Sequence, residues 1–167
     1  MTTNAKPHDL FDRLTAIGVA TTTIDHPPAF TVEEGEAHVG HLPGVHIKNL
    51  FLCDAKKKMW LVTVPWDQDI DLKTFPSVIG SKRLSFGSAD RLLRTLGVIP
   101  GSVSPFCVIN DPDATVQVVL DAWMMEQAVV IAHPLVNTKT TTIAPPDLLK
   151  FMRACGHAPR IVDFRKI

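Results

Sequence analysis

The chain has 167 residues, of which 46% are hydrophobic and 20% are charged. This composition is typical of a soluble globular protein, and the length predicts a single domain, residues 1–167, with a sizeable core. Seventeen basic residues balance seventeen acidic ones, so no global charge favours non-specific binding to nucleic acid, and we expect no DNA partner.

Apolar periodicity and capping residues predict five helices, at residues 8–17, 31–38, 72–79, 88–97 and 145–155. In the first, Leu10, Leu14 and Ile17 share one face and Gly18 follows as a cap. Thr31 is the expected N-cap of the second helix. Apolar and β-branched runs predict strands at residues 21–25, 50–53, 59–64, 116–120, 128–132, 138–143 and 161–164.

The predicted helices and strands interleave without a strict βαβ rhythm, and hairpins are frequent. We therefore predict an α/β (α+β) fold with a mixed, mostly antiparallel sheet surrounded by helices. No stretch approaches membrane-spanning length, and residues 1–6 lack the apolar core of a signal peptide. The expectation is a cytoplasmic protein with no membrane partner.

Cysteine and histidine spacing does not support a metal site. Cys53, Cys107 and Cys155 are far apart, no CxxC motif occurs, and the seven histidines form neither HxxxH nor HExxH. Buried free thiols in a reducing compartment are the simplest interpretation. We expect neither a metal nor a cofactor.

Lys48 is the first candidate for a site residue because it interrupts the apolar run from Val45 to Leu52. A partly desolvated ammonium costs several kcal/mol, on the order expected for a buried ion, unless something pairs with it. The first acid to follow is Asp54. This position predicts that Lys48 serves a binding or catalytic purpose.

Two further polar segments are candidates. In the loop 100–105, Gly101 can adopt positive φ and the flanking prolines stiffen the turn, so that N–H groups can point at a ligand. An ordinary surface turn is the alternative. His133 follows the apolar run 128–132, and a histidine at the end of a buried strand is more often structural than catalytic.

Together, Lys48–Leu52 (KNLFL), Gly101–Pro105 (GxxxP) and His133–Thr138 (HPLxNT) resemble the YbaK/prolyl-tRNA editing domain superfamily. The resemblance extends over nearly the whole chain and is closest to free-standing alanyl-tRNA(Pro) deacylases of the PrdX/ProX type. It implies an ester hydrolase that removes alanine in trans from mischarged tRNA(Pro) and excludes prolyl-tRNA(Pro) by pocket size. The implied partners are the acceptor end of tRNA(Pro) carrying alanine and prolyl-tRNA synthetase.

The resemblance also implies site residues. It places the essential lysine at Lys48, the GxxxP loop at Gly101 to Pro105 and the pocket histidine at His133, so Lys48, Gly101 and His133 are the predicted catalytic residues. The predicted substrate-binding residues are Ile47, Asn49, Leu50, Ser102, Val103, Ser104, Pro105, Val136, Asn137 and Thr138. Among them, Ile47, Leu50 and Val136 are expected to form the apolar lining for alanine.

Contact with tRNA needs positive surface despite the zero net charge. The candidates are basic residues near a predicted turn and helix: Lys56, Lys57, Lys58, Lys82, Arg83, Arg91 and Arg94. A solvated turn and an ordinary charged helix face are equally open interpretations of these residues.

The expected chemistry needs no covalent nucleophile because an aminoacyl ester is already activated. It needs a held water molecule and stabilisation of the oxyanion, for which N–H groups of the Gly101 loop are suited. Lys48 is expected to anchor a phosphate or the carbonyl region. The resemblance further implies that the terminal ribose hydroxyl helps to activate the water.

Three other functions stay open at this point. The same reaction could act on another mischarged tRNA, carrying serine, threonine or cysteine. The fold could instead serve as a non-catalytic module that binds tRNA or the synthetase. A small-ligand binding protein, in which Lys48 recognises a carboxylate, is the third alternative.

Overall fold

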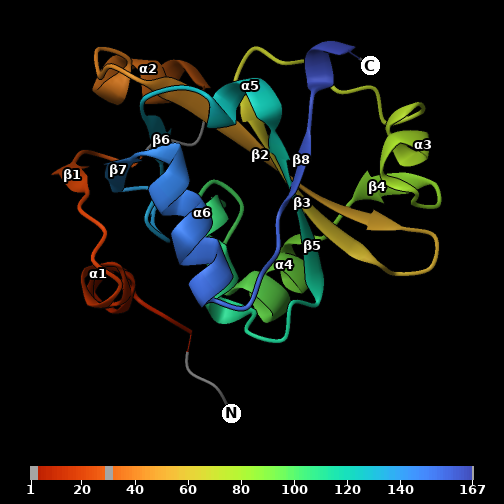
Figure 1. The fold of residues 1–167 in the computed structure, drawn as a ribbon, viewed down its shortest axis with the longest axis horizontal. Coiled ribbons are helices and arrows are strands. Elements are labelled where there is room, and N and C mark those ends of the chain that lie inside the picture. The colour runs from red at the N-terminus through yellow and green to blue at the C-terminus, as the bar shows by residue number, and fades with distance from the viewer. Residues whose placement is uncertain (1–3, 29–31, 167) are drawn as a thin grey trace.

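In the computed structural model, which describes residues 4–28 and 32–166, eight strands form one mixed sheet (Figure 1). The order is β1-β7-β6-β2-β3-β5-β8, and β4 also pairs with β2. The strands are β1 (Thr22–Asp25), β2 (Val45–Asp54), β3 (Met59–Pro65), β4 (Leu84–Phe86), β5 (Val116–Asp121), β6 (Val130–Ala132), β7 (Lys139–Ile143) and β8 (Arg160–Val162). Within this part of the chain, four strand pairs are antiparallel and three are parallel. The predicted fold class is confirmed.

Helices flank the sheet and mostly begin and end where the capping residues predict. They are α1 (Pro7–Ala16), α2 (Val32–Val39), α3 (Phe75–Ile79), α4 (Ala89–Leu96), α5 (Ala122–Met125), α6 (Pro145–Ala154) and the 3-10 helices η1 (Pro105–Asn110) and η2 (Phe164–Lys166). The Ser88 hydroxyl accepts a hydrogen bond from the Arg91 N–H at the start of α4, and Gly97, with φ +70°, ends it. The N-cap predicted at Thr31 lies outside the described residues.

Alternation of side chains along the central strands creates two core clusters, one on each face of the sheet. Phe51 of β2 and Leu61 of β3 belong to the larger cluster, together with buried residues of α1, α4, α6 and η1. The neighbouring Leu52 and Val62 belong to the smaller cluster, with residues of α3 and η2. In Figure 1, α3 and the C-terminal turn accordingly lie across the sheet from α1 and α6.

One edge of β2 has a gap between its two partner strands, β6 and β4, and this gap positions the site. Pairing with β6 involves only Val45 and His46, whereas pairing with β4 starts at Leu52. Residues 47–51 therefore face no partner strand on this side, although β3 pairs with them on the other. The strand predicted from Leu50 in fact begins at Val45. The residues from Val45 to Leu50 are only half-buried, so they lack the continuous apolar pattern by which a buried strand is predicted.

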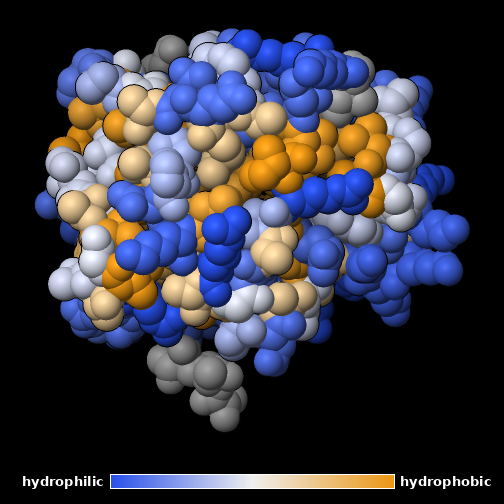
Figure 2. Space-filling model, in the orientation of Figure 1, coloured by the Kyte–Doolittle hydropathy of each residue, from blue (hydrophilic) through white to orange (hydrophobic). Residues whose placement is uncertain are grey.

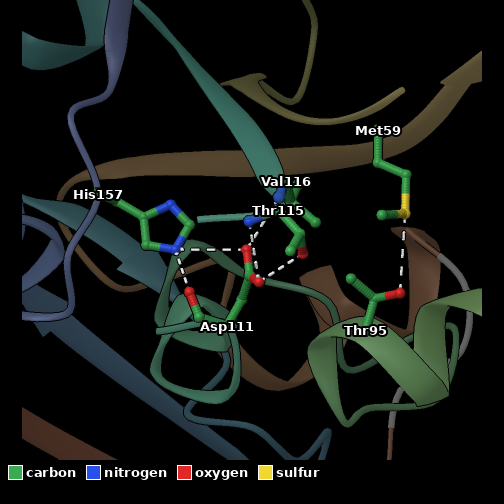
Figure 3. Close-up of polar contacts among 6 residues, drawn as sticks. All are labelled: Met59, Thr95, Asp111, Thr115, Val116 and His157. Atoms are coloured by element: carbon green, nitrogen blue, oxygen red, sulfur yellow. Dashed lines mark hydrogen bonds and ion pairs between the residues drawn. The ribbon is translucent and has the colours of Figure 1, made fainter. Parts of the chain in front are cut away.

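One buried carboxylate fixes the loop between η1 and β5 (Figure 3). Asp111 accepts hydrogen bonds from the Thr115 N–H, the Thr115 hydroxyl and the Val116 N–H. The His157 Nε2–H donates to the Asp111 carbonyl over 2.7 Å, which ties the end of α6 to this loop. These bonds satisfy polar groups that burial would otherwise penalise.

One apolar surface patch lies on β8, at the far edge of the sheet from β1. Apolar side chains gather over β8, between α5 and α3, on the face shown in Figure 2, and Ile161 of β8 is 45% exposed.

The three cysteines are free and buried, as predicted, and burial raises the pKa of Cys107 to about 11. Within the described residues, no helix has the length and apolar character needed to cross a membrane.

Candidate functional site

A cavity of about 490 Å³ lies where β2 has no partner strand. Its lining includes Lys48 and Asn49 from β2, Gly101 and Val103 from the loop before η1, and His133 from the end of β6. The three polar segments singled out in the sequence therefore meet around one space. The volume falls within the ~300–1,000 Å³ typical of small-ligand sites.

Lys48 supplies the positive charge of this cavity. Its side chain is half-buried, and among the described residues no hydrogen bond or ion pair involves its ammonium group. Asp54, the nearest acid in sequence, is occupied elsewhere: it accepts from the N–H groups of Lys56 and Lys58 at the hairpin tip. None of the described lining residues is acidic, so the cavity is suited to an anionic or strongly polar ligand.

Asn49 connects β2 to the Gly101 loop instead of pointing freely into the cavity. Its Nδ2–H donates to the Val103 carbonyl over 3.1 Å, and its Oδ1 accepts from the Thr63 hydroxyl at 2.7 Å. Thr63 is fully buried in β3 opposite Asn49. The Asn49 amide thus holds the loop through Nδ2 and is itself held by Thr63 through Oδ1, which is a positioning role.

Ser104 connects the same loop to the third segment. Its hydroxyl donates to the His133 carbonyl over 2.6 Å and accepts from the Phe106 N–H at the start of η1. Ser104 is fully buried, so these bonds form away from water. The loop is therefore held at two points, by Asn49 from β2 and by His133 from β6.

Two N–H groups of this loop remain available. The Ser102 N–H donates to the Ile99 and Pro100 carbonyls, and the Ser104 N–H donates to the Cys107 sulfur. The N–H groups of Gly101 and Val103 have no partner among the described residues. Gly101 has φ +86°, a conformation that favours glycine. Paired donors of this kind are suited to bind an oxyanion.

The hydrogen bonds of His133 define its tautomer. Nδ1 lies 3.0 Å from the Lys139 carbonyl, which can only accept, so Nδ1 carries the proton. Burial, assisted by the nearby His26, lowers the pKa of His133 despite the opposing effect of the Lys139 carbonyl. The ring is therefore neutral at pH 7, and its Nε2 is a hydrogen-bond acceptor.

His26 and Thr140 form a second polar layer beside His133. The two imidazole rings lie 6.1 Å apart between centroids. The His26 Nδ1–H donates to the Pro27 carbonyl, and Nε2 lies 2.7 Å from the Thr140 hydroxyl. Both residues line the cavity, but neither stands in a sequence segment that predicts a site.

Several predicted substrate-binding residues do not line the cavity. Leu50 packs against the smaller core cluster on the opposite face of β2. Ser102, Ser104 and Pro105 are buried within the loop and η1. In the segment 133–138, Val136, Asn137 and Thr138 are also absent from the lining. Contact of these side chains with a substrate stays a prediction that the cavity does not support.

Five of the seven predicted tRNA contacts gather around the hairpin tip, whereas Arg91 and Arg94 lie in α4. Lys56, Lys57 and Lys58 are exposed in the turn between β2 and β3, and Lys82 and Arg83 are exposed next to it. The Lys82 N–H also donates to Asp54, which joins the two segments. At about 3.3 Å per residue, Asp54, where β2 ends and this turn begins, lies roughly 20 Å from Lys48.

Some lining residues have no local signal in the sequence. They are His46, Trp66, Phe86, Gly87 and Ile131, together with His26 and Thr140. Gly87 is required by close packing, since a Cβ there would lie 2.4 Å from the Phe51 ring. Among the described residues, no group of three metal-binding side chains occurs.

Comparisons with known proteins show what this chain is similar to. The model of the aminoacyl-tRNA editing domain matches residues 26–151. The chain is 40% identical to the prolyl-tRNA editing protein ProX of Acetoanaerobium sticklandii, over 90% of this chain and 93% of that one. It is also 40% identical to the prolyl-tRNA synthetase associated domain-containing protein 1 of Bos taurus, over 94% of both chains.

A solved structure shows the same fold. It is the crystal structure of a candidate trans-editing enzyme for prolyl tRNA synthetase, with a TM-score of 0.72 and 19% identity, covering 97% of this chain and 98% of that one. At that identity the likeness concerns the fold alone. The matched family model and the two relatives carry the assignment, and they show that this chain belongs to the aminoacyl-tRNA editing domain family.

Proposed function

We propose that this protein hydrolyses the ester of alanine mischarged onto tRNA(Pro), acting in trans, and spares prolyl-tRNA(Pro). The observation that carries the proposal is that the half-buried Lys48, whose ammonium has no partner among the described residues, lines the same cavity as Gly101 and Val103, whose N–H groups are unused. A cation and two unused donors around one cavity match a ligand with a phosphate and a polarised carbonyl. The names of the relatives, which refer to prolyl-tRNA editing and prolyl-tRNA synthetase, support this substrate class.

In the proposed mechanism, the ester carbonyl oxygen receives hydrogen bonds from the Gly101 and Val103 N–H groups as it becomes an oxyanion. Lys48 holds the terminal phosphate or the carbonyl region in register. Water adds to the carbonyl carbon, the bond to the ribose oxygen breaks, and that oxygen leaves as a protonated hydroxyl. The products are free alanine and uncharged tRNA.

No described lining residue is a carboxylate, so no acidic side chain of the lining can act as the general base. We assign the proton transfer to the neighbouring hydroxyl of the terminal ribose, with the neutral His133 Nε2 accepting a hydrogen bond from the attacking water. A substrate whose free terminal hydroxyl is replaced by hydrogen should then be cleaved far more slowly. Normal turnover of that substrate would exclude the ribose hydroxyl from the mechanism.

Selection of alanine over proline is proposed to follow from the apolar part of the cavity, which Ile47, Val103 and Ile131 line. A synthetase pocket gains only about 1–3 kcal/mol per extra methylene, so smaller amino acids escape rejection there. A second site can instead exclude the larger side chain sterically. Ile47→Ala should therefore admit larger amino acids, and unchanged selectivity would reject this lining.

The test is a panel of tRNAs charged with alanine, proline, serine, threonine or cysteine, with release of each amino acid followed over time. Loss of alanine alone supports the proposal. Release of serine, threonine or cysteine instead of alanine would show that the protein catalyses the same reaction on another mischarged tRNA. Survival of every ester, with tRNA still bound, favours a non-catalytic module.

We further propose that the basic hairpin contacts tRNA. An exposed basic cluster lies just beyond the end of the strand that carries Lys48, and it consists of Lys56, Lys57, Lys58, Lys82 and Arg83. A cluster of this kind neutralises phosphates without reading sequence. Prolyl-tRNA synthetase is a second partner suggested by the names of the relatives.

A further inference from the structure

Two large aromatic side chains at the cavity are unusually exposed. Trp66 is 50% exposed and Phe86 is 65% exposed, and both line the cavity. The other exposed large hydrophobic residues among those described, Leu93, Ile99 and Ile161, do not line it. Exposed aromatic rings next to a ligand site are typical of recognition surfaces.

Backbone hydrogen bonds fix the main chain at both aromatic residues. The Trp66 N–H donates to the His46 carbonyl, while Phe86 pairs with Leu52 in the β2–β4 ladder. The Gly87 N–H then donates to the Phe51 carbonyl over 2.8 Å. The main chain of Trp66, directly after β3, is therefore fixed near His46, and that of Phe86, in β4, near Leu52. His46 and Leu52 are about 20 Å apart along β2.

The sequence near the Phe86 end of the cavity is basic, and the sequence near the Trp66 end is acidic. Phe86 follows Lys82 and Arg83, and the lysines of the hairpin tip lie beyond them. Trp66 is followed by Asp67, Asp69 and Asp71 in the sequence. A polyphosphate chain is attracted to the first end and repelled from the second. Lys48 and His133 lie between the two ends, since β6 pairs with β2 next to Lys48.

We propose that Phe86 is a stacking platform for an unpaired base of the tRNA 3′ end, and that the RNA strand reaches the cavity over the Phe86 side. This inference rests on the proposed function, whose substrate ends in a short single strand. Single-stranded nucleic acid is bound by a basic path combined with aromatic rings, because every base has a π face. The Phe86 end of the cavity offers both components.

The test measures binding without chemistry, using two uncharged RNA hairpins with the acceptor stem of tRNA(Pro). One carries the unpaired 3′ nucleotides and the other is blunt. The wild type should bind the first more tightly, and Phe86→Leu should remove ~5- to 100-fold of that affinity, as expected for one lost stack. Phe86→Tyr, which keeps the ring, should bind like the wild type.

Two further variants define the outcome. Ile161→Ala, at an exposed apolar position at the far edge of the sheet, should leave binding unchanged. Trp66→Leu should weaken binding less than Phe86→Leu, and the reverse order would overturn the proposed direction of entry. Equal binding by wild type and Phe86→Leu would overturn the stacking role, whether or not alanine is released.

Failure of this inference is distinguishable from failure of the proposed function. Binding of the overhang that depends on Phe86, without release of any amino acid, would support the stacking role and reject the hydrolase. Release of alanine with no preference for the overhang would support the hydrolase and reject the stacking role.

Discussion

The Asn49 side chain donates from Nδ2 to the Val103 carbonyl over 3.1 Å, and this bond joins β2 to the loop that carries Gly101. The orientation of the amide follows from its partners. Only NH₂ can donate to a carbonyl, so Oδ1 faces the Thr63 hydroxyl at 2.7 Å. A buried threonine in β3 therefore positions the loop through Asn49, although it does not line the cavity.

Thr63→Val should disturb this arrangement without changing the shape of the side chain. The lost hydroxyl leaves the Asn49 oxygen unsatisfied, at a cost of about 1–3 kcal/mol, and frees the amide to turn away from Val103. We expect kcat for alanine release to fall by about tenfold, since ~1.4 kcal/mol corresponds to that factor. Thr63→Ser keeps the hydroxyl and should restore the rate, whereas equal rates in both variants would contradict the positioning role.

Ser104→Ala should lower both stability and activity. The variant removes the donor to the His133 carbonyl and the acceptor for the Phe106 N–H in a fully buried place. Thermal or urea unfolding should show a loss of about 1–3 kcal/mol. Ser102→Ala is the matched control, because the bonds of Ser102 shown in the loop use backbone atoms. A larger loss in the control would show that the Ser104 bonds are not what holds the loop.

The activity should depend on the protonation of His133. Its pKa lies below the ordinary value of 6.5 because of burial and the nearby His26. The neutral Nε2 acceptor should therefore persist at pH 6.5, and kcat/KM should fall only at lower pH, as the folded pKa is crossed. His133→Asn can keep the bond to the Lys139 carbonyl but lacks Nε2, so it should have a low rate without this acid limb.

The lowered pKa of His133 also makes the free energy of unfolding depend on pH. The direction follows from which state, folded or unfolded, binds the proton first as the pH falls. The unfolded chain protonates His133 near 6.5, and the folded protein protonates it only at lower pH. The contribution of His133 is therefore fully present above 6.5 and is lost as pH falls through the folded pKa. Urea unfolding across this range should show a smaller pH dependence for His133→Asn than for the wild type.

The hairpin contribution to tRNA binding should appear in its salt dependence. Lys56→Gln with Lys58→Gln leaves the turn intact, because Asp54 accepts from the backbone N–H groups of these residues. If both lysines contact phosphates, the slope of log affinity against log salt should decrease by about 1–2. Lys150→Gln, in α6, serves as the control. An unchanged slope in the double variant would favour a solvated turn.

The sequence predicts the helices and long strands because capping residues and apolar runs act locally. It does not predict β4, which has three residues with Ser85 and Phe86 exposed, or the short helices η1 and α5. Short, half-exposed elements have no periodic pattern, and tertiary pairing with β2 determines where β4 lies.

The residues of the site likewise fall into those that sequence patterns predict and those that they do not. Lys48, Gly101 and His133 stand in short polar segments that sequence patterns single out, and all three line the cavity. The sequence analysis predicts Leu50 in the apolar lining, but its side chain packs against the smaller core cluster, on the opposite face of β2 from Phe51. Thr63, Trp66 and Phe86 have no such signal, since their roles follow from register across the sheet and from exposure.

The most direct test compares alanine release from alanyl-tRNA(Pro) with proline release from prolyl-tRNA(Pro), using wild type, Lys48→Met and Lys150→Met. Lys48→Met keeps an apolar stem but removes the unpaired charge in the cavity, while Lys150 is exposed in α6. The account predicts rapid release of alanine only, retained in Lys150→Met and abolished in Lys48→Met. Alanine that stays attached, or Lys48→Met that is as active as the wild type, would contradict it.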